Sequence, residues 1–218
     1  MYQMARAERL LAYAIAAAAG FVDAAGFLAA DRYFVSFMSG NTTRLGVELA
    51  RGSGAALIAA LLLGGFIVGV AAGALVAERC GQRRKSAVLA LSAGLLAMAG
   101  AGAAMGQPLA FLGCAVLAMG AINNVFRKQG EVALGVTYMT GALVRVGEGL
   151  AALLNPRIKG RKSALPSLLL WASLSGGGLL GALAFLNLGG SAPWLATAWL
   201  VALTLAARAI ERRDPQSS

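Results

Sequence analysis

The chain has 218 residues, of which 59% are hydrophobic and 13% charged, and its net charge is +10. With a mean hydropathy of +0.73, this composition excludes a water-soluble globular protein and indicates an integral membrane protein. The sequence contains no histidine. This excludes imidazole metal sites and the Ser/His or Cys/His pairs of many hydrolases, so we expect no enzyme, no catalytic residues, no metal and no cofactor.

Six apolar stretches approach the roughly 20 residues that an α-helix needs to cross a bilayer core. They run over residues 10–30, 54–77, 86–105, 108–125, 164–186 and 192–207. The first follows two arginines and also suits a signal peptide, but it continues past Asp23 and has a matching segment later in the chain. We interpret it as a membrane helix, and the sequence predicts an all-α membrane protein with six transmembrane helices.

Two further segments, 34–50 and 135–151, mix apolar residues with charged ones. Neither offers the run of about 18 apolar residues that is typical of a crossing helix. We therefore expect each segment to form a re-entrant or broken polar half-helix.

An internal repeat relates these two polar motifs. A shift of 101 residues lays 38–50 over 139–151, with Met, Gly, Arg, Leu and Ala residues coinciding. Without a gap, the same shift places Asp23 over Asn124. Chance similarity between helices rich in alanine and glycine does not readily explain matches that include arginine and methionine.

The repeat divides one membrane domain into residues 1–106 and 107–210, each with a helix, a polar motif and two more helices, followed by a polar cytoplasmic tail over 211–218. If about seven residues are inserted in the second copy, glycines in the helix after each motif also correspond. These glycines are Gly69 and Gly73 in the first copy, and Gly177 and Gly181 in the second. Their spacing lets helix backbones approach closely.

The positions of the basic residues favour one topology through the positive-inside rule. If both motifs return to the side from which they enter, six crossings remain, and with the N-terminus in the cytoplasm 15 basic residues lie inside and two outside. If both motifs cross, the counts are 10 and 7. Six crossings are favoured, with both termini in the cytoplasm. Three crossings per copy is an odd number, so the two copies have opposite orientations, as in inverted-repeat transporters.

In this topology the motifs enter from opposite faces, and the N-terminal ends of their helices meet near the bilayer midplane. Ser39 or Asn41 in the first motif and Thr140 in the second suit helix N-caps, while Gly40 and Gly141 suit tight turns. Two facing helix N-termini attract an anion.

Charged side chains in the motifs allow two interpretations. Arg44 and Arg145 strengthen an anion-attracting site if they are free. They are instead neutralised within each motif if Arg44 pairs with Glu48 and Arg145 pairs with Glu148. Asp23, well inside the first helix, is expected to be neutral, paired with an arginine such as Arg44, or able to bind a proton or cation.

These considerations give one set of candidate substrate-binding or ion-binding residues. They are Asp23, Ser39, Gly40, Asn41, Thr42, Arg44, Glu48, Asn123, Asn124, Thr140, Gly141, Arg145 and Glu148.

The motifs GFVDAAGFLA (20–29), FVSFMSGNTTRLG (34–46) and VTYMTGALVRVGEGLA (136–151) resemble the YoaK-like family of multi-pass bacterial membrane proteins over nearly the whole chain. The family's Val-Asp-Ala matches Val22 to Ala24, and its Met-Thr-Gly-Asn matches Met38 to Asn41 with serine at position 39. Its Thr-Gly-Thr matches Thr140 to Ala142, where the last hydroxyl is lost. The resemblance implies a membrane location and this fold, but no substrate, because the family is a domain of unknown function.

Together these features predict a transporter or channel of the bacterial inner membrane for a small polar or anionic solute. The alternative is a non-transporting membrane scaffold or sensor whose midplane charges are structural. Besides the solute, the expected partners are membrane lipids, including anionic headgroups at the cytoplasmic face, and no nucleic acid. The glycine-rich faces suit packing within one subunit or in a homo-oligomer equally.

Overall fold

The computed structural model describes residues 5–128, 131–132, 137, 139–155, 157–158 and 161–213. Within these residues the chain is a helical bundle. The α-helices are α1 (Arg6–Ala29), α2 (Met38–Ala50), α3 (Ala55–Cys80), α4 (Arg84–Ala104), α5 (Pro108–Ile122), α6 (Met139–Leu154), α7 (Arg161–Leu188) and α8 (Ala192–Arg213). The remaining elements are the 3-10 turns η1 (Gly81–Arg83) and η2 (Gly189–Ser191) and a small antiparallel hairpin of β1 (Arg127–Lys128) and β2 (Glu131–Val132).

The all-α class predicted from the sequence is confirmed. Three continuous helical stretches are long and apolar enough to cross a membrane, namely 6–29, 55–104 and 162–213. The second and third each contain two helices, joined at η1 and η2, and α5 is a shorter apolar helix. Helix α8 continues through Arg213, so residues 211–213 belong to this helix and not to a tail, because the Glu211 side chain is buried against α4.

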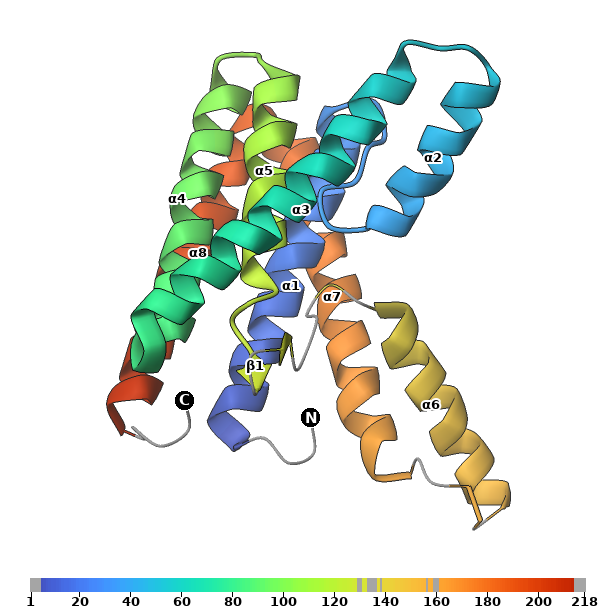
Figure 1. Cartoon of the computed structure of the whole chain (residues 1–218), viewed down its shortest axis with the longest axis vertical. Helices are drawn as coiled ribbons and strands as arrows, with labels where there is room; N and C mark the ends of the chain where they lie inside the picture. Colours follow the sequence, from blue (N-terminus) through green and yellow to red (C-terminus); the bar gives the residue numbers. More distant parts are fainter. Residues whose placement is uncertain are drawn as a thin grey trace.

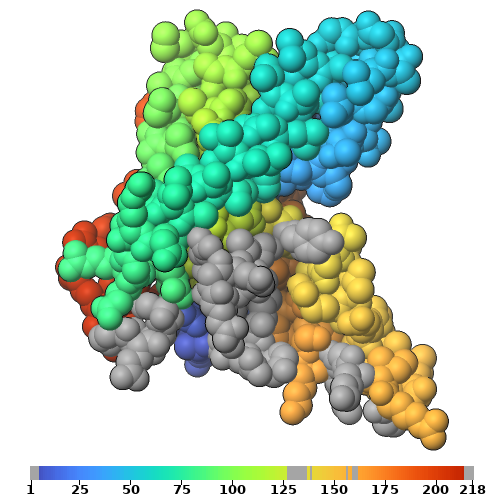
Figure 2. All heavy atoms as spheres, viewed as in Figure 1, coloured from blue at the N-terminus to red at the C-terminus, as the bar shows by residue number. Residues whose placement is uncertain are grey.

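The two most buried helices, α1 and α5, form the centre of the bundle (Figure 1). Helix α7 packs on α1, α3 packs on α5, and α4 and α8 pack on each other. Figure 2 shows α3 lying diagonally across one face of the molecule. The polar motifs contribute the two short helices on the periphery, where α2 packs on α3 and α6 packs on α7.

The short helices α2 and α6 run in opposite directions. Figure 1 shows that the first turn of each lies near mid-height of the molecule, at its periphery, and that the last turns lie at opposite ends. The start of α1 and the end of α8 lie at the same end, together with η1. Neither α2, with 13 residues, nor α6, with 16, is long enough to match the roughly 20 residues of a crossing helix.

Glycines allow the central helices to touch through their backbones. A Cβ atom added at Gly177 would overlap the carbonyl oxygen of Ala17, and one added at Gly69 would overlap that of Leu117. Gly181 and Gly73 contact the backbones of Phe21 and Ala121 in the same way. The close approach predicted from these four glycines is confirmed, since a side chain at any of them would push two helices apart.

The contacts between α1 and α7 match those between α5 and α3. Gly20 of α1 packs against Leu174 of α7, and Gly120 of α5 packs against Phe66 of α3. The contacts at α1 recur at α5 after 100 residues, whereas the polar motifs are 101 residues apart. The prediction that Asp23 matches Asn124 without a gap is therefore wrong. By these contacts Asp23 corresponds to Asn123, and the chain between this helix and the polar motif is one residue longer in the second half of the chain.

Two buried polar contacts hold the helices together at the end where α1 starts and α8 ends. The ammonium group of Lys85, only 2% exposed, pairs with the carboxylate of Glu8 at 2.8 Å. The next residue, Ser86, donates to Glu211 through its amide at 3.1 Å and its hydroxyl at 2.6 Å. Helices α1 and α8 are thus both fastened to the first turn of α4.

The close contact between α1 and α7 predicts that substitutions at two adjacent glycines of α7 have different effects on stability. Gly177→Ala should lower the free energy of unfolding by about 1–3 kcal/mol, because the added methyl group overlaps α1. Gly176→Ala is the control: no atom lies within 4 Å of its added Cβ. It should be neutral or stabilise the helix by up to about 1 kcal/mol. Unfolding by sodium dodecyl sulfate in mixed micelles measures both, and equal effects would contradict the glycine crossing.

Candidate functional site

The chain reverses direction directly after α1 and runs back along that helix. Asp31 and Arg32 make the turn in the left-handed region, with φ angles of 47° and 61°. The returning backbone is not helical, so its amides need partners inside an apolar bundle. Asp23 supplies them: one carboxylate oxygen accepts the amides of Val35 and Ser36 at 2.7 and 2.9 Å, and the other accepts the Ser36 hydroxyl at 2.8 Å.

Asn41 pairs with the same returning segment from the other side. Its Nδ2 donates to the carbonyl oxygen of Phe34 at 2.7 Å, and its Oδ1 accepts the Phe34 amide at 3.1 Å. The Asn41 side chain is fully buried. It therefore satisfies both backbone groups of one residue, as a neighbouring β-strand would.

The predicted helix caps are wrong. Helix α2 begins at Met38, its N-cap position is Phe37, and no side chain caps it. Ser39 is exposed and Asn41 lies within the first turn, engaged with Phe34. Likewise α6 begins at Met139, so Thr140 is already helical. Both helices begin one residue or more earlier than the hydroxyl pattern indicates, and before α2 the flanking segment is held by Asp23 and Asn41.

Gly40 and Gly141 do not make turns, because both lie within helices. Gly40 has a different reason to lack a side chain: an added Cβ would come within 2.6 Å of the Phe37 ring and 2.9 Å of the Phe34 ring. These rings pack against each other with centroids 5.2 Å apart, and Phe34 also packs on Phe27 at 5.0 Å. Glycine thus makes room for an aromatic cluster at the start of α2.

Arg44 does not pair with Glu48 or with Asp23, so both predicted ion pairs are wrong. Its guanidinium pairs with the carboxylate of Asp31 at 3.1 Å, donates to the Asp31 carbonyl, and lies 3.9 Å from the centroid of the Tyr33 ring. Glu48 pairs with Arg51 at 3.5 Å instead. The reversal after α1 brings Asp31 beside α2, and Asp23 is already engaged with the returning backbone.

Asn123 makes a contact that corresponds to one of those of Asp23. Asn123 Oδ1 accepts the Thr137 hydroxyl at 3.2 Å, in the place where Asp23 accepts that of Ser36. Asn124 contacts a different helix: its Nδ2 donates to the carbonyl of Val70 in α3 at 2.9 Å. Ser36 and Thr137 are not among the residues predicted for the site, although both carry hydroxyls and the shift of 101 residues aligns them.

Arg145 binds across to α7 and not within its own motif. Its Nε donates to the Ser167 hydroxyl at 3.2 Å, and no ion pair within the described residues joins it to Glu148, which is exposed. The predicted pair with Glu148 is therefore wrong.

The hydroxyl of Thr42 donates to the Met38 carbonyl of its own helix at 2.9 Å. Residues 135, 136 and 138 of the second motif lie outside the described residues.

A cleft of about 370 Å³ lies between α1 and α7, and Asp23 and Phe34 form part of its wall. On α7 it extends from Leu174 to Ala182, about 12 Å along the helix axis. The Arg145–Ser167 contact sets the level of α6, which runs antiparallel to α7 (Figure 1). Counting six residues back from Arg145 places Met139 near the level of residue 173. The first turn of α6 therefore lies near the level of the cleft, whose wall is formed by α1, by α7 and by Phe34 of the segment that leads into α2.

Polar groups in this region are few and mostly hydrogen-bonded. Asp23 and Ser175 are the polar side chains among the residues that line the cleft. Within the described part of the chain, no three histidine, cysteine or carboxylate side chains gather as metal ligands would. Arg44 and Arg145 do not converge on a common partner, because the first binds Asp31 and the second binds Ser167.

The anchoring role of Asp23 predicts that its shape matters more than its charge. Asp23→Asn should retain the fold and lose less than about 1.5 kcal/mol, because the amide oxygen still accepts backbone amides and its NH₂ group can donate to Ser36. Asp23→Leu should lose about 1–3 kcal/mol for each buried amide left unpaired. Unfolding in mixed micelles compares the two. Equal instability of both variants would mean that the negative charge itself is required.

Comparisons with known proteins agree with this picture. The model of a family described as "Protein of unknown function (DUF1275)" matches residues 11–206. The UPF0700 transmembrane protein RA0705 of Rhizobium meliloti (strain 1021) is 36% identical over 205 residues, which cover 93% of this chain and 87% of that protein. No solved structure matches. The resemblance noted from the motifs is confirmed, and the chain is a membrane protein that belongs to the DUF1275 family of proteins of unknown function.

Proposed function

We propose that this protein is a transporter or channel that moves a small polar or anionic solute across the bacterial inner membrane. The observation that carries the proposal is the pair of half-length helices α2 and α6, which start near mid-height of the molecule and run toward opposite ends (Figure 1). Non-helical backbone at such depth is tolerated where it is buried in protein or lines a cavity. Discontinuous helices of this kind frame substrate sites in inverted-repeat transporters.

Six crossings in two inverted copies follow from the same proposal. The matching contacts of α1 with α7 and of α5 with α3 support a two-fold relation between the copies. The basic residues near the ends of α1 and α8 and around η1 favour placing that end of the molecule in the cytoplasm. Helix α2 then belongs to the outer half of the membrane and α6 to the inner half.

The cleft beside Asp23 is the solute pathway that fits this arrangement. Its volume of about 370 Å³ lies within the usual range for sites that bind small molecules. It borders the segment that leads into α2 and lies near the level of the first turn of α6, and the N-terminal ends of helices carry partial positive charge. Arg145 adds a half-buried cation whose hydrogen bond goes to the Ser167 hydroxyl, with no carboxylate partner among the described residues. Together these groups favour an uncharged polar solute or an anion.

Cysteine labelling of intact cells tests the inverted topology. The two native cysteines, Cys80 and Cys114, are first replaced by serine, and Arg51→Cys and Leu154→Cys are then introduced singly. Both positions are exposed, at the ends of α2 and α6. A membrane-impermeant maleimide should label the Arg51→Cys variant from outside, and the Leu154→Cys variant only after the cytoplasmic side is opened.

Restoring Cys80 alone provides a matched reference, because it is exposed at the end of α3 that the proposal places in the cytoplasm. Labelling of positions 51 and 154 from the same side would refute the inverted topology.

Flux measurements in reconstituted vesicles test the pathway, with a panel of small anions, amino acids and cations as solutes. Ala182→Leu places a larger side chain in the cleft at the level of Asp23 and should abolish most of the flux. Ala172→Leu makes the same change at an exposed position of α7 outside the cleft, and it should transport like the parent protein.

Asp23→Asn separates proton coupling from facilitated passage. If this variant folds but loses uphill transport, the carboxylate couples solute movement to protons; if it transports normally, the protein is a channel or facilitator. Absence of protein-dependent flux for every solute, with the expected topology, would favour the scaffold or sensor alternative. That alternative draws on the observation that Asp23 and Arg44 are both engaged in structural contacts.

A further inference from the structure

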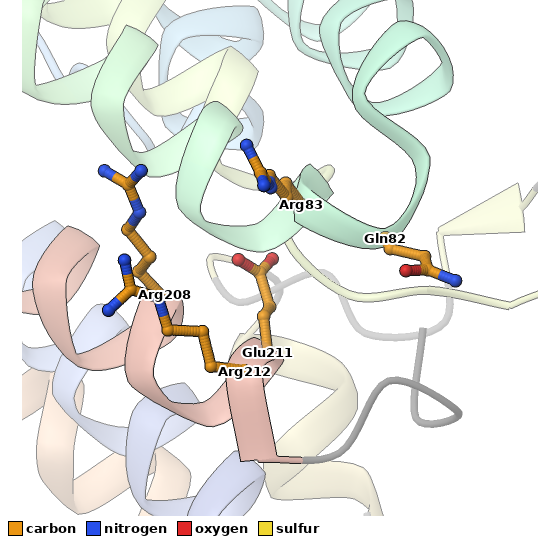
Figure 3. A pocket seen from close by; sticks show the side chains of 5 residues that line it. All are labelled: Gln82, Arg83, Arg208, Glu211 and Arg212. Atoms are coloured by element: carbon orange, nitrogen blue, oxygen red, sulfur yellow. The ribbon is translucent and has the colours of Figure 1, made fainter.

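A second pocket lies far from the cleft, at the end of the bundle that carries η1 and the last turns of α8 (Figure 3). It has a volume of about 200 Å³ and is lined by Gln82, Arg83, Arg208, Glu211 and Arg212. The wall of the pocket thus contains three arginines and one glutamate. Figure 3 shows the side chains of Arg208 and Arg212 on one side of α8, with the Glu211 carboxylate directed toward the turn that carries Arg83.

The single carboxylate in this pocket is already engaged. Both oxygens of Glu211 accept hydrogen bonds from Ser86, one from its amide and one from its hydroxyl. In contrast, the side chains of Arg83, Arg208 and Arg212 form no hydrogen bond or ion pair within the described part of the chain. The pocket therefore presents an excess of positive charge with unused donors in a fork geometry that suits phosphate oxygens.

An apolar strip leads from the bundle to these arginines. Val201, Leu205, Arg208 and Arg212 follow one another at intervals of four, three and four residues, so they lie on one face of α8. Val201 and Leu205 are 47% and 63% exposed. A ligand with a phosphate head and hydrocarbon chains matches this order, because its chains would lie along the leucine and valine while its head reaches the arginines.

We infer that this pocket binds the phosphate group of an anionic phospholipid from the inner leaflet. Arg208 and Arg212 hold the phosphate, Arg83 approaches it from η1, and Glu211 keeps α8 against α4 so that the arginines from the two helices stay together. The inference rests on the orientation of the protein in the membrane and is independent of solute movement. A soluble phosphate compound has the same head chemistry but lacks the chains that use the apolar strip.

The test uses the purified full-length protein in a neutral detergent. Its thermal stability is titrated with short-chain phosphatidylglycerol, with phosphatidylcholine of the same chains, and with inorganic phosphate. Phosphatidylglycerol should raise the melting temperature at concentrations where the other two have little effect. The double variant Arg208→Gln/Arg212→Gln should bind phosphatidylglycerol about thirtyfold more weakly.

The matched control is Arg6→Gln/Arg79→Gln, which removes two exposed basic residues from the same end of the molecule but outside the pocket. It should keep the parent's affinity. An equal loss in both double variants, or no preference of the parent for phosphatidylglycerol over phosphatidylcholine, would overturn the site. Equal stabilisation by inorganic phosphate would show a phosphate site that does not select lipid and would overturn the lipid assignment. The titration of the parent protein decides between a lipid site and a general phosphate site even if a variant is unstable.

Discussion

The structure depends on one constraint: backbone amides and carbonyls inside an apolar bundle must have partners. Helices meet it by themselves, but the segment between α1 and α2 is not helical and turns back along α1. Asp23 and Asn41 supply the missing hydrogen-bond partners from either side of this segment. The carboxylate of Asp23 accepts the amides of Val35 and Ser36, and the side-chain amide of Asn41 pairs with both backbone groups of Phe34. These two side chains hold the segment from which α2 begins, so the start of the half-helix that carries the functional proposal depends on them.

The glycine crossings solve a different problem. Apolar surfaces gain little from mutual burial when the surroundings are also apolar, so helices in a membrane associate chiefly through close packing. Gly177 and Gly181 bring α7 against α1, and Gly69 and Gly73 bring α3 against α5. The short helices α2 and α6 are carried by α3 and α7, the helices that contain these glycines. The positions of α2 and α6 therefore depend on the close packing of α3 on α5 and of α7 on α1.

The sequence predicted the helices well and the polar contacts poorly, for a physical reason. Apolar length and glycine spacing are local properties, so the helix positions and the close-packed faces follow from them. The contacts of Arg44 depend on how the chain folds back, and the turn at Asp31 places a carboxylate beside it that is 13 residues away in sequence. Pairing rules within a helix favoured Glu48, which is nearer in sequence but bound to Arg51. The one-residue difference between the copies was likewise invisible, because adjacent asparagines at 123 and 124 fit either alignment.

The two copies use different chemistry at equivalent positions, and this bears on function. At position 23 a carboxylate accepts hydrogen bonds from two backbone amides and from the Ser36 hydroxyl, and at position 123 an amide accepts the Thr137 hydroxyl and donates to the Met119 carbonyl of its own helix. If anchoring were the only requirement, an amide would serve in both copies without the cost of a buried charge. The copy with the carboxylate is also the one whose anchor borders the cleft. Under the transport proposal, the acidic side chain therefore lies where a solute or proton can reach it.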